Sequence, residues 1–155
     1  NAKLAGISKI EGRHGTHGGG RLGARGYPSV EIIGPRLDGS GGFARIGDTD
    51  GGRWDGDGAF DRAVGPMQFI PSTWARWGRD GDGDGVTDPF TIYDAAAAAA
   101  AYLCHGRTDL TDDGQLRAAY FSYNHSQAYV AAVITAAHGY RAALDVPAHE
   151  PVAAP

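Results

Sequence analysis

The stretch DAAAAAAAYLCHG, residues 94–106, is an apolar run with helix signals at both ends. Asp94 is a suitable N-cap residue, and Gly106 is a suitable glycine just past the last turn. The run is shorter than the roughly 20 residues that a membrane span needs. Because alanine side chains are small, neighbouring elements can approach such a helix closely. We therefore expect a buried helix at the centre of the protein.

Three further segments have helical patterns: residues 71–78, 112–123 and 126–144. In the second, Leu116, Tyr120 and Tyr123 fall on one face. Ser72 and Ser126 are the expected N-caps of the first and third segments. The sequence therefore predicts a mainly α fold.

Composition limits the class of protein. A chain of 155 residues with 42% hydrophobic residues suits one domain with a real core. The net charge of −4 argues against a nucleic-acid partner. Cys104 is the single cysteine, so no internal disulfide can form, and we expect a buried thiol. We predict a monomeric domain over residues 1–145 and a Pro/Ala-rich tail or linker over residues 146–155.

Glycine is enriched, at 25 residues, and it concentrates in residues 12–58 and 78–85. The first region contains one short predicted strand, residues 27–34, and otherwise reads as a long structured loop. Its expected apolar anchors are Ile32, Ile33, Phe43, Ile46 and Trp54. Its acidic residues have no standard ligand spacing, so we expect them to form turns, with Asp61 also pairing with Arg62; they are Asp48, Asp50, Asp55, Asp57 and Asp61.

A single acid, Glu11, falls on the most apolar face of the first helical segment, beside Leu4, Ile7 and Ser8. Its carboxylate either points into solvent at the frayed helix end or enters an apolar wall. In the second case desolvation raises its pKa, which is what a general acid needs.

Gln68 stands among apolar residues in the stretch AVGPMQFIPSTWARWG, residues 63–78. A buried amide needs hydrogen-bond partners. Gln68 either satisfies the backbone of its own loop or binds sugar hydroxyl and N-acetyl groups, with Met67 and Phe69 against a pyranose face.

The order of these motifs resembles the lytic murein transglycosylases of the membrane-bound B type, especially their secreted actinobacterial branch. The stretch GPMQFIPSTW, followed at once by DGDGDG, is the most specific part, and the likeness runs from Ile7 to about Tyr140. The resemblance implies a lysozyme-like α fold. It also implies cleavage of the β-1,4 bond between N-acetylmuramic acid and N-acetylglucosamine in peptidoglycan without water, leaving 1,6-anhydro ends. It implies a secreted or cell-envelope protein that acts on glycan strands, with no signal segment in this chain.

The resemblance also assigns roles to residues. Glu11 corresponds to the catalytic acid, although Gly12 stands where the family usually has serine. The residues implied for substrate binding are Gly65, Pro66, Met67, Gln68, Phe69, Ser72, Tyr123, Asn124 and Tyr129.

The expected chemistry needs one acid and no cofactor. The acid protonates the leaving oxygen, and its carboxylate then removes the proton of the C6 hydroxyl of the sugar. The 2-acetamido group can stabilise the intermediate in place of a protein nucleophile. Two alternatives stay open at the level of sequence. One is a hydrolytic muramidase that takes a second carboxylate from residues 48–61, and the other is a non-catalytic glycan-binding or calcium-binding module.

The stretch RDGDGDGVTDP, residues 79–89, has the spacing of an EF-hand-like loop. Position 12 is Thr91 and not the usual glutamate, and Pro89 interrupts the loop. The loop is either a weak structural calcium site or a solvated acidic turn. The predicted ligands are Asp80, Asp82, Asp84, Val86 through its carbonyl, and Asp88.

Overall fold

The computed structural model describes residues 2–144, so the predicted tail at residues 146–155 lies outside the described residues. The described chain contains five α-helices and one two-stranded antiparallel sheet, which confirms the mainly α prediction. The elements are α1 (Ala2–Gly12), β1 (Ile33–Arg36), β2 (Arg62–Val64), α2 (Pro71–Trp77), α3 (Ile92–Cys104), α4 (Asp113–Tyr123) and α5 (Gln127–Leu144).

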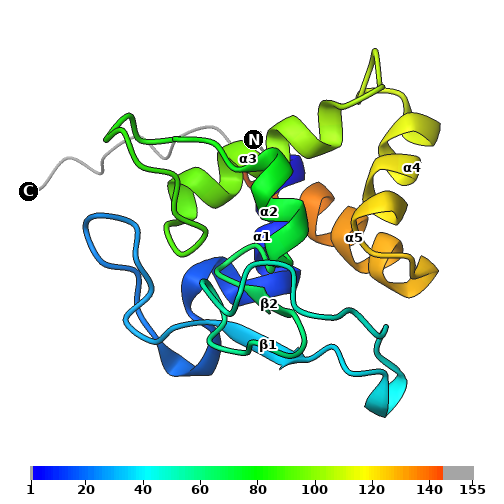
Figure 1. Cartoon of the computed structure of the whole chain (residues 1–155). Helices are drawn as coiled ribbons and strands as arrows, with labels where there is room; N and C mark the ends of the chain where they lie inside the picture. Colours follow the sequence, from blue (N-terminus) through cyan, green and yellow to red (C-terminus); the bar gives the residue numbers. More distant parts are fainter. Residues whose placement is uncertain (1, 145–155) are drawn as a thin grey trace, which may run out of the picture.

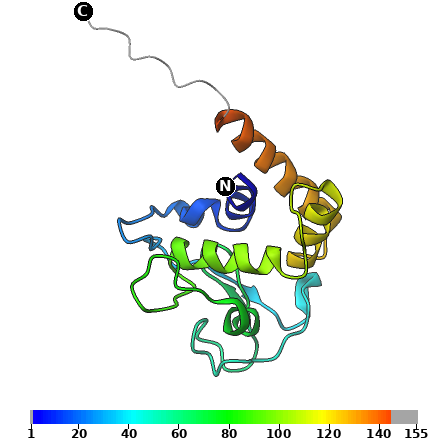
Figure 2. The ribbon, with the colours of Figure 1, turned by 90° about the horizontal axis from the view of Figure 1, so that it is seen from above.

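The alanine-rich helix α3 lies across the middle of the protein (Figure 2). It separates α1 and α5 on one side from α2, the sheet and the long loops on the other (Figures 1 and 2). Ala95, Ala98 and Ala99 are fully buried. The predicted central position of this segment is therefore confirmed.

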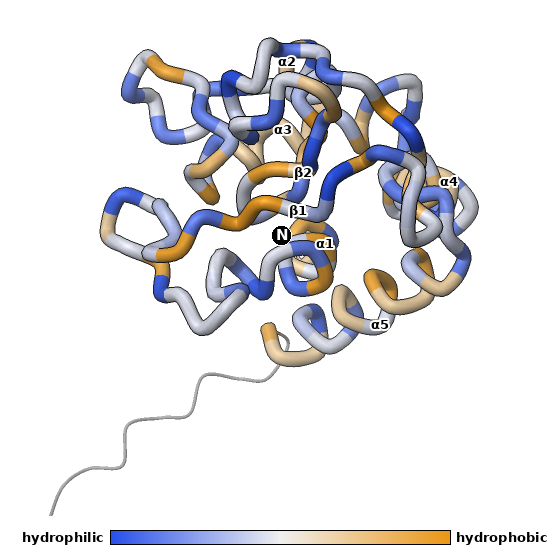
Figure 3. The backbone as a smooth tube through the Cα atoms, turned by 60° about the horizontal axis from the view of Figure 1, so that its bottom comes forward, coloured by the Kyte–Doolittle hydropathy of each residue, from blue (hydrophilic) through white to orange (hydrophobic). Residues whose placement is uncertain are grey.

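The two ends of the described chain pack against each other, since α1 makes its most extensive contact with α5. Hydrophobic residues gather on α1, α5 and the two short strands, whereas the long loops are mostly hydrophilic (Figure 3). Ile7 of α1, Tyr120 of α4 and Val133 of α5 are fully buried in one core. The Tyr120 hydroxyl also donates to the Lys3 carbonyl oxygen at 3.2 Å. This core fixes the position of the end of α1.

Two of the predicted helix starts are wrong. Thr91, not Asp94, caps α3, because the Thr91 hydroxyl accepts from the Asp94 backbone N–H. Helix α2 begins at Pro71, whose fixed φ suits the first helical position, so Ser72 lies inside the first turn. The expected glycine after α3 is confirmed, since Gly106 has a φ of +67°.

The strand prediction for residues 27–34 is largely wrong. The strand β1 runs from Ile33 to Arg36, with Ile33 opposite Val64 of β2. Its partner β2 places the strand, since the pairing runs from Ile33 opposite Val64 to Arg36 opposite Arg62. Of the expected anchors, Ile32 is buried and Trp54 packs on the core, but Ile33 and Phe43 are 38% and 47% exposed.

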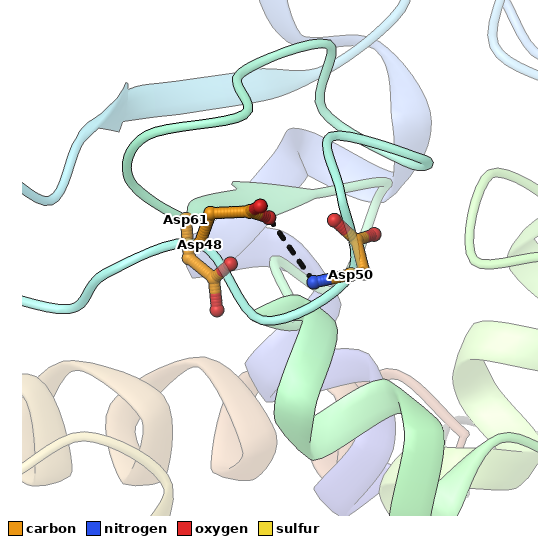
Figure 4. Close-up of side chains that lie close together, drawn as sticks. All are labelled: Asp48, Asp50 and Asp61. Carbon is orange, nitrogen blue, oxygen red and sulfur yellow. Dashed lines mark hydrogen bonds between the residues drawn. The ribbon is translucent and has the colours of Figure 1, made fainter.

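In the acidic part of the long loop, carboxylates accept hydrogen bonds from backbone N–H groups and so form turns, as the sequence predicted. Asp48 accepts from the backbone N–H groups of Asp50, Gly51 and Gly52 at 2.9–3.1 Å. Buried Asp61 accepts from the backbone N–H and the hydroxyl of Thr49. Figure 4 shows Asp48, Asp50 and Asp61 close together.

The predicted pair of Asp61 with Arg62 is wrong. Arg62 forms an ion pair with Asp57 at 3.4 Å, and Asp57 also pairs with Arg36 at 2.7 Å. The Arg36 guanidinium is the main cause that lowers the pKa of Asp57. The two oxygens of Asp61 are already used by Thr49, so Arg62 turns to Asp57 instead.

Cys104 is exposed, so the prediction of a buried thiol is also wrong. It ends α3, and the preceding Leu103 takes the buried position at 2% exposure. None of the described helices combines the length and the hydropathy that crossing a membrane requires.

Candidate active site

Glu11 lies one residue before the end of α1 and is partly buried. One turn earlier, Ile7 and Ser8 are 0% and 6% exposed, as the helical pattern predicts. Burial raises the pKa of the Glu11 carboxyl from 4.5 to about 7. The acid therefore enters an apolar wall, which favours its protonated form.

Two tyrosines share this environment. The Tyr129 hydroxyl, from α5, interacts with the Glu11 carboxyl and lowers its pKa, which partly offsets the effect of burial. Within the described chain, however, this buried hydroxyl has no partner at ordinary hydrogen-bond geometry. The Tyr129 hydroxyl and the Glu11 carboxyl therefore lie close enough to affect the pKa of Glu11 but do not form a hydrogen bond of ordinary geometry. The pKa of Tyr123, from α4, is raised first by burial and next by the charge of Glu11.

The turn between β2 and α2 contains the GPMQF motif. Gly65 has a φ of +75°, and a Cβ there would lie 1.9 Å from the Pro89 carbonyl oxygen. Only glycine fits this position. The Met67 side chain is fully buried, and its carbonyl accepts from the Tyr123 hydroxyl at 2.8 Å. The turn, α4 and Glu11 are thereby linked through Tyr123.

Gln68 occupies a left-handed conformation, with a φ of +52°. Its side-chain amide donates to the carbonyl oxygens of Gly65 at 3.0 Å, Ile32 at 3.4 Å and Ala63 at 3.5 Å. Gln68 therefore satisfies backbone carbonyls, as the first of the two alternatives expected. Its amide nitrogen donates within its own loop and to the segment that contains Ile32. The amide also lines a cavity, where a ligand can reach it.

That cavity, of about 330 Å³, lies between the GPMQF turn, α2 and the end of α4. Among the predicted residues, Gln68, Phe69 and Tyr123 line it. Glu11 is not in its lining, and Tyr123 connects the two. Ser72 and Asn124 are exposed and lie outside the lining. The sequence reasoning missed other lining residues, which are Ile46, Ile70, Thr73, Tyr102, Ser122 and His125.

The signal that could have found some of them is closeness in sequence to the predicted residues. Ser122 adjoins Tyr123, Ile70 adjoins Phe69, and His125 follows Asn124. Tyr102 gave no local signal, since it comes from α3 and reaches the cavity only through the packing of three helices.

The acidic loop before α3 is arranged differently from the predicted ligand set. Carboxylate oxygens of Asp80, Asp82 and Asp94 lie within 4.8 Å of one another, whereas Asp84 is not in this group. Buried Asp94 accepts from the backbone N–H groups of Gly81 and Asp88. Three converging carboxylates suit a hard cation such as Ca²⁺. Asp94, which the sequence reasoning took for an N-cap, thus stands in this group in place of the predicted Asp84.

The carboxylate of the predicted ligand Asp88 does not belong to this group. The backbone N–H of Val86 donates to the Asp84 carboxylate, and the Asp88 carboxylate accepts from Phe90. Asp80 itself accepts from Gly83, Asp84 and Gly85, so the loop also has the bonds of an acidic turn.

Comparison with known proteins adds one finding. Residues 48–108 match the family described as Transglycosylase SLT domain. The searches of curated proteins and of solved structures gave no significant match. The matched segment includes both acidic loops, the GPMQF turn, α2 and the whole of α3, whereas Glu11 lies before it and Tyr123 and Tyr129 lie after it. Over this segment the chain is similar to a transglycosylase SLT domain, and its fold is the mainly α, lysozyme-like arrangement expected of one.

Proposed function

We propose that this protein is a lytic transglycosylase of peptidoglycan. It cleaves the β-1,4 bond between N-acetylmuramic acid and N-acetylglucosamine and leaves 1,6-anhydro-muramyl ends, with Glu11 as the single acid and base. The observation that carries the proposal is the partly buried Glu11 carboxyl with a pKa of about 7, coupled to Tyr123 and Tyr129 beside the GPMQF turn.

The pKa of Glu11 suits both halves of the reaction. A group that titrates near the working pH can donate a proton to the leaving oxygen and afterwards accept one from the C6 hydroxyl. The Tyr129 hydroxyl favours the ionised form that follows proton donation, because its interaction lowers the pKa of Glu11. Burial favours the protonated form that begins the cycle.

One acid is sufficient for this route. The pKa of Glu11 is shifted by burial and by Tyr129, and no acidic neighbour contributes within the described residues. The carboxylates that a hydrolase would recruit from the acidic loop are held by that loop, since Asp48, Asp50 and Asp61 all accept from nearby backbone N–H groups. This arrangement favours an internal hydroxyl nucleophile over an activated water.

The substrate implies the place of action, so we propose that the protein works outside the cytoplasm, in the cell envelope or beyond it. The cavity lined by Gln68, Phe69 and Tyr123 is the proposed glycan groove. Ca²⁺ at Asp80, Asp82 and Asp94 would have a structural role only. The relation to the B-type family is part of the same proposal.

Digestion of purified peptidoglycan, followed by mass spectrometry of the released muropeptides, tests the proposal. Anhydro ends are lighter than hydrated reducing ends by one water. Anhydro products that disappear with Glu11→Gln support it. Hydrated ends would instead indicate a muramidase, and no release at all would indicate a binding module.

A further inference from the structure

A second and larger cavity, of about 740 Å³, lies beside the proposed groove. It is formed by the ends of α2 and α3 and one side of α4. We call it the arginine pocket and define it by Arg76, Trp77, Tyr102, His105, Arg107 and Ser122. The proposed reaction does not use its two arginines, its tryptophan or its histidine.

The arginine pocket adjoins the proposed groove directly. Tyr102 and Ser122 line both cavities, and the Tyr102 hydroxyl donates to the Ser122 carbonyl at 2.6 Å. Edge-to-face ring contacts run from Tyr123 to Tyr102 at 5.4 Å and from Tyr102 to Trp77 at 5.7 Å. A branched ligand can therefore have one part in the groove and another in the pocket.

The pocket is cationic in an acidic protein. The chain has a net charge of −4, yet the residues that line this cavity include two arginines and a histidine and no acid. Neither Arg76 nor Arg107 forms an ion pair within the described chain, in contrast to Arg36, Arg62 and Arg117. The charge of this surface is complementary to that of an anion.

Neutral groups hold Arg107 in place, whereas Arg76 is exposed and lies over the ring of its neighbour Trp77. The Arg107 guanidinium donates to the carbonyls of Leu103, His105 and Ala118 and to the Ser122 hydroxyl, at 3.0–3.3 Å. Arg76 lies over the Trp77 ring, 5.1 Å from its centroid, and His105 packs on that ring at 4.8 Å. The pocket therefore presents fixed positive charge beside aromatic surface.

We propose that the arginine pocket binds the carboxylate-bearing peptide stem of peptidoglycan, an inference that rests on the proposed function. The lactyl group of each muramic acid is joined to the stem through an amide, so the glycan strand itself is neutral and the stem provides the anionic groups. Arginine suits carboxylates because its planar guanidinium donates two parallel hydrogen bonds. The aromatic wall accommodates the apolar parts of the stem.

The direct test is binding of N-acetylmuramyl-L-alanyl-D-glutamate, followed by NMR at the Trp77 indole and the His105 ring. The same molecule with both carboxylates amidated is the uncharged control. We expect shifts at these rings with the acid only, and an affinity about tenfold lower in Arg76→Glu, the scale of one charge-assisted hydrogen bond. Arg53→Glu is the matched variant, because Arg53 is likewise exposed and lies over a tryptophan ring, at 4.5 Å from Trp54. It should bind like the wild type.

Two results would overturn the inference. One is equal binding of the acid and the amidated control. The other is displacement of the acid by an equal concentration of inorganic phosphate, which would point to a general anion site. Because this readout needs no turnover, it remains decisive even if the protein releases no anhydro products.

Steady-state kinetics of glycan cleavage provide a second test. On strands that retain their stems, Arg76→Glu should raise KM about tenfold with kcat unchanged. On strands whose stem carboxylates have been amidated, the variant and the wild type should have the same KM. An equal loss on both substrates would show that the pocket does not recognise the stem carboxylates.

Discussion

Gly12 lies directly against the backbone of Pro66, so that a Cβ on Gly12 would be 2.6 Å from the Pro66 carbonyl oxygen. This contact joins the end of α1 to the GPMQF turn. In the lytic transglycosylases that the sequence resembles, serine usually follows the acid. The structure gives a reason for glycine at this position, which is the close approach of two backbones.

Gly12→Ser should therefore destabilise the fold by about 1–3 kcal/mol, the usual cost of overpacking, since backbone and not a flexible side chain must shift. The displacement also moves Glu11 from its wall, so the reaction rate should fall with it. Thermal denaturation measures the first effect. Gly139→Ser is the control, because a Cβ on this glycine of α5 meets nothing within 4 Å. Equal melting temperatures for the two variants would refute the steric reading.

Glu11→Gln should abolish most activity and stabilise the protein at neutral pH. The loss in rate is expected at about 10²–10⁴-fold, the scale of general acid–base catalysis. The folded-state pKa of about 7 lies above the ordinary 4.5, so the wild type loses stability as pH rises from 4.5 to 7. One pKa unit corresponds to about 1.4 kcal/mol, so the loss reaches up to about 3 kcal/mol.

Urea denaturation at pH 4 and pH 8 tests the stability part. The two proteins should be similar at pH 4, and the glutamine variant should be the more stable one at pH 8. Glu31→Gln, at an exposed position, controls for charge. A variant that gains nothing at pH 8 would mean that the carboxylate is solvated.

Tyr129→Phe should move the pH profile without unfolding the protein. Removing the hydroxyl removes the interaction that lowers the pKa of Glu11, so the rate should persist to higher pH before it falls. Stability should be unchanged or higher, because this buried hydroxyl has no hydrogen-bond partner at ordinary geometry in the described structure. The kcat/KM profile from pH 5 to 9 is the measurement. An unshifted alkaline limb contradicts the coupling of the two groups.

Calcium should raise the melting temperature of metal-free protein. At about 10 mM and a dissociation constant of roughly 10⁻⁴–10⁻³ M, the stabilisation is about 1–3 kcal/mol. The effect should be lost in Asp94→Asn and retained in Asp84→Asn, because the carboxylates that converge are those of Asp80, Asp82 and Asp94. The reverse outcome would restore the sequence-based ligand set. No shift in the wild type would leave the loop as a turn.

Local patterns predicted the helices well and the loop poorly. The core faces of Ile7, Tyr120 and Val133 follow from helical periodicity. The same periodicity placed Glu11 on the apolar face but left open whether its carboxylate is buried, and the structure shows that it is largely desolvated. The strand and several anchors were wrong because the loop is held by carboxylate-to-backbone bonds. Such bonds depend on which N–H groups a turn brings together, and hydropathy does not reveal this.

In the candidate site, too, local motifs were predictable and contacts between distant segments were not. Its motif residues were predicted one by one, yet Asp94 was taken for a cap, and Tyr102 was not considered. Asp94 reaches the acidic loop, and Tyr102 joins two cavities, only because α2, α3 and α4 pack together. Such contacts join segments that are distant in the sequence, so no regular spacing of residues predicts them.

The packing of α1 on α5 has a consequence for biosynthesis. Glu11 is near the start of the described chain and Tyr129 is in its last helix, and the neighbouring hydrogen bond between His14 and Tyr140 spans 126 residues. A nascent chain therefore makes Glu11 long before it makes α5, and Tyr129 can lower the pKa of Glu11 only after α5 has packed on α1. A chain interrupted before α5 lacks this interaction and the main packing partner of α1, so it should be inert.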